Sequence, residues 1–349
     1  GTENIPFTGV FDGKNKRITG LTINRSSLSC VGLFGFTGLG CQLKNLQLVN
    51  SNVSGNTYVG CLVGELVSGV ITNCYVTGNV SGNNTIGGLV GGYCGTIANC
   101  YSTCYVSGNR SVGGLVGCQN SGIITDCYAT GSVIGSVYVG GLIGGASGTI
   151  SNCYATGKVS GYDYYGGLVG VQGDDVTITN CYYDCQTTGC SDTGKGNPRT
   201  TAEMHRQATF EGWDFDTTWK IVEGVSYPYL SALGDECTLT VSVIGCGTVT
   251  PMAGSYTHSY GEAIPISATP DTGWHLVEWL GGNVADAHDT NTTVVMDSNK
   301  TVTAHFRKFY EIRTLAELQA VKDDLDGHYI LMNDIDASET SSWNDGAGF

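Results

Sequence analysis

A repeat of 26 to 27 residues constrains the fold of this chain more than any other feature of its sequence. An apolar-glycine box recurs as VGCLVG at residue 59, IGGLVG at 86, VGGLVG at 112, VGGLIG at 139 and YGGLVG at 165, with a degenerate VGLFG at 31. A second box has nearly the same spacing: TNCYVTG begins at residue 72, ANCYSTC at 98, TDCYATG at 125, SNCYATG at 151 and TNCYYDC at 179. Two boxes per period indicate one structural unit, repeated along residues 31–190.

Each unit reads as short strands and turns. No copy has the 3.6-residue periodicity of a helix, whereas apolar and β-branched runs such as GTIANCY alternate with Gly and Asn. Stacked units of this length predict an all-β fold, a right-handed parallel β-helix in which inward side chains meet their counterparts one coil away. The 53 Gly residues would supply tight corners and positive φ angles.

The boxes GGLVG and NCYxTGxVSG resemble the GLUG repeat of large bacterial and archaeal surface proteins. Six copies within residues 31–190 carry the resemblance. It implies an extracellular β-helix, as in adhesin-like passengers and in non-catalytic regions of some secreted peptidases.

Cysteine is abundant at 15 residues, which suggests an oxidising, extracellular setting. Five cysteines share one position of the second box, where stacking predicts an inward column that packs as small hydrophobes; a metal or redox ladder is the alternative. These five are Cys74, Cys100, Cys127, Cys153 and Cys181. Among the others, Cys94 with Cys118 on adjacent coils, and Cys185 with Cys190 in one loop, are candidate disulfides.

Residues 191–235 differ from the β-helix that we assign to residues 1–190. A polar stretch precedes Thr200 and Glu203, which have capping-box spacing for a short helix. The aromatic residues that follow are expected to plug the exposed edge of a terminal coil rather than to stack on sugars. They are Trp213, Phe215, Trp219, Tyr227 and Tyr229. GLUG arrays commonly close with a similar tail, so we interpret 191–235 as linker, short helix and C-terminal cap.

Residues 236–308 alternate as strands and need no helix. The elements GTVTP, ATPDTGW and KTVTAHF resemble the divergent internalin-type bacterial repeat, a small β-rich module of surface proteins. The resemblance implies a spacer or stalk element. Trp274 and Trp279 are expected to be core anchors.

Residues 309–349 begin with a Thr314/Glu317 capping box and an amphipathic helix, and the stretch GHYILMNDIDAS then predicts a strand. In GLUG proteins a similar helix and strand precede the first coil and run on into PFTGVFDGKNKRITGLTI. Here WNDGAGF occupies residues 343–349, whereas PFTGVFDGKNKRITGLTI begins at residue 6. The chain therefore reads as one circularly shifted unit of a longer array.

An open first coil exposes unpaired backbone groups and is a template for another strand. We expect residues 309–349 to cover the first coil of a neighbouring β-helix, in the next unit of the same polypeptide or in a separate chain, which gives a head-to-tail fibre. The side chains expected at this contact are Leu315, Leu318, Val321, Tyr329, Leu331 and Ile335. The alternatives are a segment folded back on residues 1–30 and a domain fragment.

Charge and motifs disfavour several classes of function. The net charge of -15 disfavours nucleic acid, and no apolar run approaches the ~20 residues of a membrane span, so we expect no membrane insertion. No HExxH, GxSxG or phosphate-binding motif occurs, and the charged residues of the repeat share no column, so we expect no enzyme and no catalytic residue. We expect no cofactor; Ca²⁺ at Asp174 and Asp175, or at Asp334 and Asp336, is the alternative.

Seven sequons would bear N-linked glycans in a host that attaches them. They are Asn24, Asn52, Asn79, Asn83, Asn109, Asn291 and Asn299. The four at 52, 79, 83 and 109 share one turn region.

The leading interpretation is an extracellular structural or adhesive protein, at the cell surface or secreted, whose partner is itself. One alternative is a carbohydrate-binding or carbohydrate-cleaving β-helix that recognises surface glycans through exposed Tyr162, Tyr164 and Tyr165. The other is the non-catalytic stalk of a larger secreted enzyme.

Overall fold

The computed structural model describes residues 1–233, 236–259, 262–296, 299–323 and 327–340. The chain divides into two compact units, residues 1–234 and 235–349. The WNDGAGF stretch at 343–349 lies outside the described residues, so the expectation for it stays a prediction.

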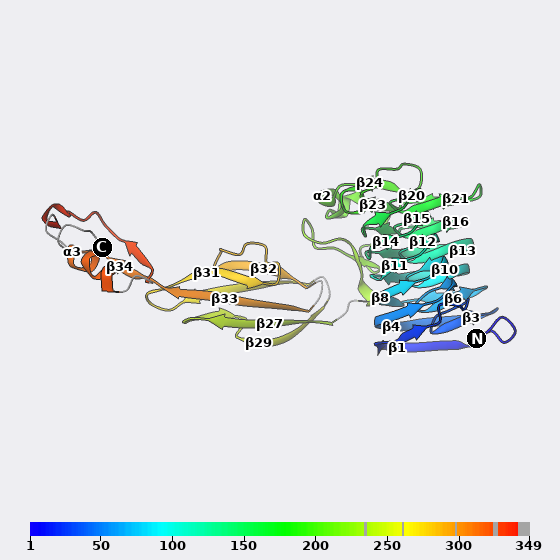
Figure 1. The fold of residues 1–349 in the computed structure, drawn as a ribbon, viewed down its shortest axis with the longest axis horizontal. Helices are drawn as coiled ribbons and strands as arrows, with labels where there is room; N and C mark the ends of the chain where they lie inside the picture. Colours follow the sequence, from blue (N-terminus) through cyan, green and yellow to red (C-terminus); the bar gives the residue numbers. More distant parts are fainter. Residues whose placement is uncertain (234–235, 260–261, 297–298, 324–326, 341–349) are drawn as a thin grey trace. The chain divides into compact units, whose positions relative to one another are not determined.

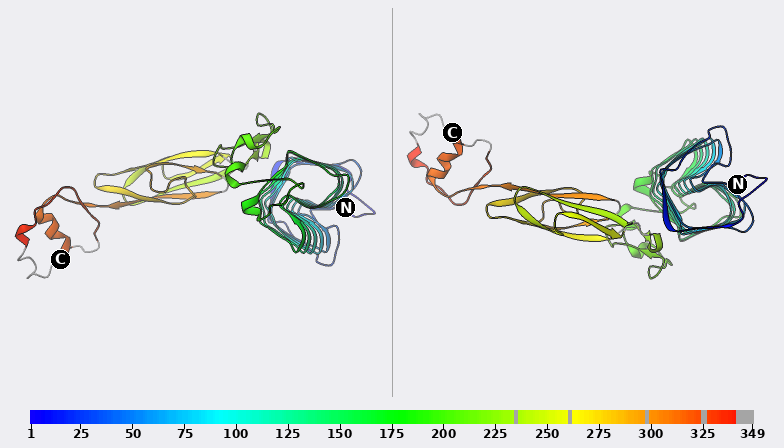
Figure 2. Two further views of the ribbon diagram at one scale, coloured as in Figure 1. Left: turned by 90° about the horizontal axis from the view of Figure 1, so that it is seen from above. Right: turned by 90° about the horizontal axis from the view of Figure 1, so that it is seen from below.

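The first unit is the predicted parallel β-helix, and Figure 2 shows its stacked coils end-on. Most of its strands form one large parallel sheet: β1 (Val10–Thr19), β2 (Thr22–Asn24), β3 (Phe34–Thr37), β4 (Cys41–Ser54), β6 (Val63–Leu66), β7 (Gly69–Thr72), β8 (Tyr75–Ser81), β10 (Val90–Ser102), β11 (Tyr105–Ser107), β13 (Val116–Ala129), β14 (Val133–Ile134), β16 (Ile143–Ala146), β17 (Thr149–Ser151), β18 (Tyr154–Ala155), β19 (Val159–Ser160), β21 (Val169–Gln172), β22 (Thr177–Thr179), β23 (Tyr182–Asp184) and β24 (Asn197–Arg199). A second parallel sheet consists of β5 (Thr57–Val59), β9 (Asn84–Gly87), β12 (Arg110–Gly113), β15 (Val137–Gly140) and β20 (Asp163–Gly166).

The register of the coils follows the sequence repeat. Cys100 pairs with Cys127, and Tyr101 pairs with Tyr128. One apolar position of the first box forms a fully buried column of Val59, Ile86, Val112 and Val139. Residues at the same position of successive repeats therefore occupy the same place in successive coils.

Glycine has the expected role at Gly69, Gly122 and Gly148, where φ is positive, and a second role in the boxes. The box glycines are needed because coils approach closely: a Cβ on Gly114 would lie 2.2 Å from the carbonyl oxygen of Gly141, with no positive φ at Gly114. One column of corners uses short polar side chains with φ between 51° and 54°. These residues are Asn45, Asn73, Asn99, Asp126, Asn152 and Asn180. Their amides also bridge coils, since Asn73 Nδ2 donates to Asn45 Oδ1 at 3.1 Å.

The chain covers part of the last coil itself. Strand β24 pairs in parallel with β23, and Lys195 Nζ donates to the carbonyl oxygens of Tyr165 and Gly170 at 3.3 and 2.9 Å. Gly167 N donates to Asp192 Oδ1 at 2.9 Å. Residues 192–199 therefore bond part of the terminal edge, whereas β20, β21 and β22 each pair with one strand among the described residues.

The aromatic residues predicted to plug the terminal edge lie elsewhere. They run along the flank of the β-helix (Figure 1) and cover an outward tyrosine column. The rings from Tyr75 to Tyr154 stack with centroids 4.6 to 4.9 Å apart. The column is Tyr75, Tyr101, Tyr128, Tyr154 and Tyr182. Trp219 packs on Tyr128 and Tyr154, and its Nε1 donates to Asp126 Oδ1 at 3.1 Å. The cover is needed because the tyrosine of each NCY box faces away from the core.

Short elements make up this covering segment: α1 (Cys185–Thr188), α2 (Thr201–Met204), the 3-10 turns Gln207–Thr209 and Ser231–Leu233, and the antiparallel pair β25 (Trp219–Lys220) and β26 (Tyr229–Leu230). The Thr200/Glu203 capping box is formed.

The second unit begins with a module of two sheets. One sheet has the order β29 (Gly254–Ser259), β27 (Glu236–Ile244), β33 (Lys300–Lys308) and β31 (Trp274–Gly281); the other has the order β28 (Gly247–Thr250), β30 (Ala263–Pro270) and β32 (Asn291–Val295). Trp279 is buried in the core between them with Leu239, Val302 and Phe306, whereas Trp274 packs there half-buried.

The end of the chain forms a small strand-helix-strand element. Strands β34 (Tyr310–Ile312) and β35 (Tyr329–Leu331) pair in parallel, with α3 (Leu315–Ala320) and the 3-10 turn Val321–Asp323 between them. The Thr314/Glu317 capping box is formed as predicted. Ile312 is the apolar side chain that this element buries, and α3 buries none of its own.

Candidate functional site

The first coil of the β-helix has an open edge. Strands β1 and β2 both pair with β4, and within the described ranges no strand pairs with their other side. The exposed fraction is 77% for Ile5, 59% for Val10 and 53% for Leu28, and Phe11 is also exposed. We call β1 and β2 with these four side chains the first-coil edge. Its free backbone groups and apolar side chains suit the addition of a strand.

The charge of this edge differs from that of the chain. Residues 1–30 hold four basic side chains, Lys14, Lys16, Arg17 and Arg25, against two acidic ones, so the sum is 4 − 2 = +2. Residues 309–349 hold two basic and nine acidic side chains, which gives 2 − 9 = −7. The two ends are therefore complementary in charge, and three of the basic residues lie on β1.

The C-terminal segment, residues 309–340, leaves apolar surface uncovered. Of the six side chains predicted at an assembly contact, Leu331 is 60% exposed and none is buried. Tyr310 and Met332 are also exposed, at 42% and 44%. The structure thus brings Tyr329 next to Tyr310, with ring centroids 5.5 Å apart, but builds no closed core from Leu315, Leu318, Val321 and Ile335.

The predicted inward cysteine column lies in the β-helix core. All five thiols are fully buried, and each Sγ lies 3.0 to 3.3 Å from the carbonyl oxygen two residues earlier. Burial raises the pKa of Cys100 and Cys153, whereas at Cys127 between them burial is outweighed by hydrogen bonds with these two thiols, which lower the pKa to about 6.

Cys94, Cys118, Cys185 and Cys190 are free thiols in the structure, and the two candidate disulfides stay predictions. A register shift places Cys94 opposite Ser121 instead of Cys118. Cys185 is the first residue of the one-turn helix α1, and Cys190 is buried directly after the left-handed Gly189 that ends this helix.

The carboxylates weighed for Ca²⁺ are all exposed, Asp174 and Asp175 between β21 and β22, and Asp334 and Asp336 after β35. Hydrogen bonds from the backbone N and side chain of Ser338 lower the pKa of Asp336. Across the described residues, no group of three or more His, Cys, Asp or Glu has an arrangement that holds a metal ion. None of the helices in these ranges has the length and hydropathy of a membrane span.

The sequon asparagines are exposed throughout: Asn24, Asn52, Asn79, Asn83, Asn109, Asn291 and Asn299. Asn52 pairs with Asn79 on adjacent strands, and Asn109 N donates to the carbonyl oxygen of Asn83 at 2.8 Å. Asn52 and Asn79 form one column, Asn83 and Asn109 form a second, and the two columns make one polar stripe.

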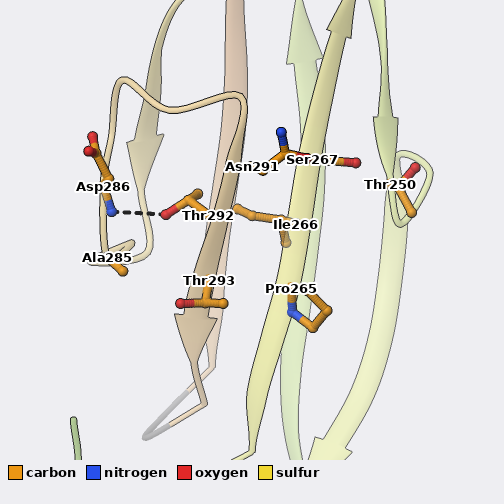
Figure 3. A pocket seen from close by; sticks show the side chains of 9 residues that line it. All are labelled: Thr250, Pro265, Ile266, Ser267, Ala285, Asp286, Asn291, Thr292 and Thr293. Carbon is orange, nitrogen blue, oxygen red and sulfur yellow. Dashed lines mark hydrogen bonds between the residues drawn. The ribbon is translucent and has the colours of Figure 1, made fainter. Parts of the chain in front are cut away.

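A shallow groove lies on the three-stranded sheet of the second unit, and Figure 3 shows its lining. Hydroxyl and aliphatic side chains dominate, and Asp286 is the one ionisable residue among the nine that line it. Its backbone N donates to Thr292 Oγ1 at 2.9 Å. The groove thus offers polar contacts but no acid–base pair.

Exposed tyrosines gather on the second sheet of the β-helix. Tyr162 is 91% exposed and Tyr164 59%, and the Tyr164 ring lies 5.5 Å from that of Tyr138. The guanidinium of Arg110 lies 4.4 Å from the centroid of the Tyr138 ring. We call these four residues the tyrosine cluster. The sequence pointed to Tyr162, Tyr164 and Tyr165 but not to Arg110 and Tyr138; the available signal was that Tyr138 lies one repeat before Tyr164. Tyr165 aligns with Val139 of the inward column but is itself 46% exposed.

Two family models match this chain. The GLUG motif matches residues 108–134 and 135–160, and the divergent InlB B-repeat domain matches residues 237–309. These are the two resemblances that the sequence boxes carry.

Two curated proteins share short stretches with it. A candidate Gly-rich membrane protein of Evansella cellulosilytica is 54% identical over 55 residues, 15% of this chain and 6% of that protein. Halomucin of Haloquadratum walsbyi is 39% identical over 72 residues, 21% of this chain and 1% of that protein. The matched stretches therefore span a small part of each relative.

A solved structure, a candidate immunoglobulin A1 protease from Bacteroides ovatus, is similar with a TM-score of 0.50 and 26% identity, over 64% of this chain and 77% of that chain. These similarities fit a surface or secreted β-helix protein. The chain carries GLUG motifs in its β-helix and a divergent InlB B-repeat domain after it.

Proposed function

We propose that this chain is an extracellular structural protein that assembles head to tail, with residues 309–349 of one unit completing the first coil of the next. The observation that carries the proposal is the difference between the two ends of the β-helix. Residues 192–199 cover part of the last coil through β24 and Lys195, whereas the first-coil edge keeps unpaired backbone along β1 and β2 together with exposed apolar side chains. A surface of this kind is stable in water when another strand covers it.

The C-terminal segment has the properties of that cover. It supplies a strand, β35, whose one partner among the described strands is β34, so its other side is available for a parallel pairing. Its exposed Leu331 and Met332 would meet Val10 and Phe11, and the net charge of −7 on residues 309–349 would face the +2 of residues 1–30. The resemblance to GLUG proteins supports the same contact, because a similar helix and strand precede PFTGVFDGKNKRITGLTI in those proteins.

The role is structural rather than catalytic. Stacked coils supply a stiff element and the InlB B-repeat domain a spacer, and the named relatives include a membrane protein and halomucin. Joined end to end, such units would extend from a cell surface.

Deleting residues 309–349 should convert concentration-dependent oligomers of the full chain into monomers, since the deletion removes the strand that covers the first-coil edge. Light scattering coupled to size exclusion measures both species. Equal oligomerisation of the two chains would contradict the proposal.

A charge reversal at the edge supplies a matched comparison. Lys16→Glu on β1 should raise the concentration needed for assembly by about tenfold, and by less at high salt, because it removes attraction to the acidic segment. Lys158→Glu changes the net charge equally on an exposed site of a distant coil and should leave assembly unchanged. Equal effects of the two variants would show that net charge alone matters.

A second candidate function, glycan binding, rests on the tyrosine cluster. Flat exposed rings beside a guanidinium suit the apolar faces and hydroxyls of sugars. Tyr164→Ala should weaken binding to a glycan-array hit by about tenfold, or 1.4 kcal/mol, whereas Tyr105→Ala, an exposed tyrosine on β11 outside the cluster, should not. Absence of any array hit, or equal losses in both variants, would remove this candidate.

A further inference from the structure

Cys61 and Cys104 stand at positions where the middle coils carry glycine. Cys61 is the third residue of its first box, and the aligned residues are Gly88, Gly114, Gly141 and Gly167, with Leu33 in the degenerate box. Cys104 ends the stretch NCYSTC, and the aligned residues are Gly78, Gly131 and Gly157, with Cys185 in the last box and Ser51 opposite Gly78. The two cysteines lie on adjacent coils.

Both positions leave little room for a side chain in the middle coils. A Cβ on Gly141 would lie 2.1 Å from the carbonyl oxygen of Gly167, and a Cβ on Gly157 would lie 1.9 Å from that of Gly131. The coils around Cys61 and Cys104 accommodate a β-carbon there, as the first and last coils do at Leu33 and Cys185.

The two thiols meet inside the β-helix. Their Sγ atoms are 3.9 Å apart, and both side chains are fully buried. In the inward cysteine column, the Sγ atoms of Cys100 and Cys127 lie 3.2 and 3.1 Å, respectively, from a backbone carbonyl oxygen of their own coil. Contact with Cys104 and burial raise the pKa of Cys61, which favours its neutral thiol once the core has formed.

We propose that Cys61 and Cys104 form a disulfide that cross-links two adjacent coils through the core. Two S–H bonds are lost and one S–S bond forms, while an external disulfide, either a small molecule or a dithiol oxidoreductase, takes up the two electrons and two protons and becomes two thiols. The sulfur atoms must approach from 3.9 Å to about 2.05 Å. Exchange takes place during folding, before the coils close over the thiols.

Such a bond would strengthen the region next to the first-coil edge. It closes a loop from residue 61 to residue 104, and it joins two adjacent coils. Closing a loop of this length restricts the unfolded chain. Inside the core the bond is shielded from reduction, which suits an extracellular setting.

The test uses the full chain secreted into an oxidising medium. The protein is denatured in acid, its free thiols are alkylated without reductant, and its peptides are identified by mass spectrometry. We expect the peptides with Cys61 and Cys104 to be linked. Reduction in denaturant, followed by refolding with the thiols kept reduced, should lower the unfolding midpoint by roughly 10 °C. Alkylation of both thiols, or a link from either one to another cysteine, would overturn the proposal.

The repeat itself supplies the variants. Cys61→Gly with Cys104→Gly restores the residues of the other coils, so it should fold, with an unchanged far-ultraviolet circular dichroism spectrum, and should lose the effect of reduction on the midpoint. Cys118→Gly, at a register position that holds Gly92 and Gly145 on adjacent coils, should keep both the link and the effect. A midpoint that still falls on reduction in the double variant would assign the effect to other cysteines.

Discussion

Gly141→Ala should lower the free energy of unfolding of the β-helix by about 4 kcal/mol or more. The new β-carbon would lie 2.1 Å from the carbonyl oxygen of Gly167 and 2.9 Å from the Cβ of Ala155. Both neighbours belong to stacked coils, and a carbonyl oxygen cannot move without disturbing the ladder that holds it. Chemical denaturation followed by circular dichroism measures the loss.

Gly145→Ala is the matched control four residues further along the same coil. Its new β-carbon would meet Cys118 Sγ at 3.5 Å and Val171 Cγ1 at 3.7 Å, which is ordinary contact. The register position also accepts the side chains of Cys118 and Val171 on adjacent coils. We expect stability within about 1 kcal/mol of the parent chain. Similar losses in the two variants would contradict the close stacking described for Gly141.

Asp184→Ala should have the second-largest effect, a loss of about 3 to 5 kcal/mol, and should release the segment that covers the tyrosine column. The Asp184 carboxylate is fully buried and accepts hydrogen bonds from four donors. Gln186 N and Thr187 N donate at 2.8 and 3.1 Å, and the hydroxyls of Thr201 and Tyr227 each donate at 2.6 Å. The carboxylate thereby caps α1 and ties the covering segment to the last coil.

Release of this segment has its own signals. Trp213 and Trp219 would become exposed, so their fluorescence would shift to longer wavelength, and proteases would cut within residues 200–233. Asp214→Ala is the comparison, because Asp214 caps an exposed turn through Thr217 N at 3.0 Å and does not join the segment to the β-helix. Unchanged fluorescence and proteolysis in Asp184→Ala would show that the aromatic packing holds the segment without this carboxylate.

The period of the sequence predicts most of the β-helix because equal residues one repeat apart meet equal environments. Cys100 above Cys127 follows directly from the alignment of the boxes. The residues at the corners are harder to predict from the sequence, because glycine is the residue normally expected where φ is positive. The structure uses Asn73 and its counterparts there and keeps the box glycines for close approach, which is a property of neighbouring coils rather than of the local sequence.

In the covering segment and the candidate site, too, local features could be predicted from the sequence and tertiary contacts could not. The capping box at Thr200 was readable from local spacing, but the hydrogen bond from Trp219 to Asp126 joins residues far apart in the sequence. The helix and strand after residue 309 were likewise predicted from their pattern. The one-sided pairing of β1, which defines the candidate site, is a consequence of tertiary structure, and the sequence pointed to it through the order of the boxes.

Hydrogen exchange in β1 tests the central claim most directly. The full chain is compared at concentrations below and above the onset of assembly, beside the chain that lacks residues 309–349. Amides of residues 10–19 that are not bonded to β4 should become protected on assembly in the full chain alone, because β35 of the next unit would pair with them. Equal exchange of these amides at every concentration, or equal protection in the shortened chain, would contradict the head-to-tail account.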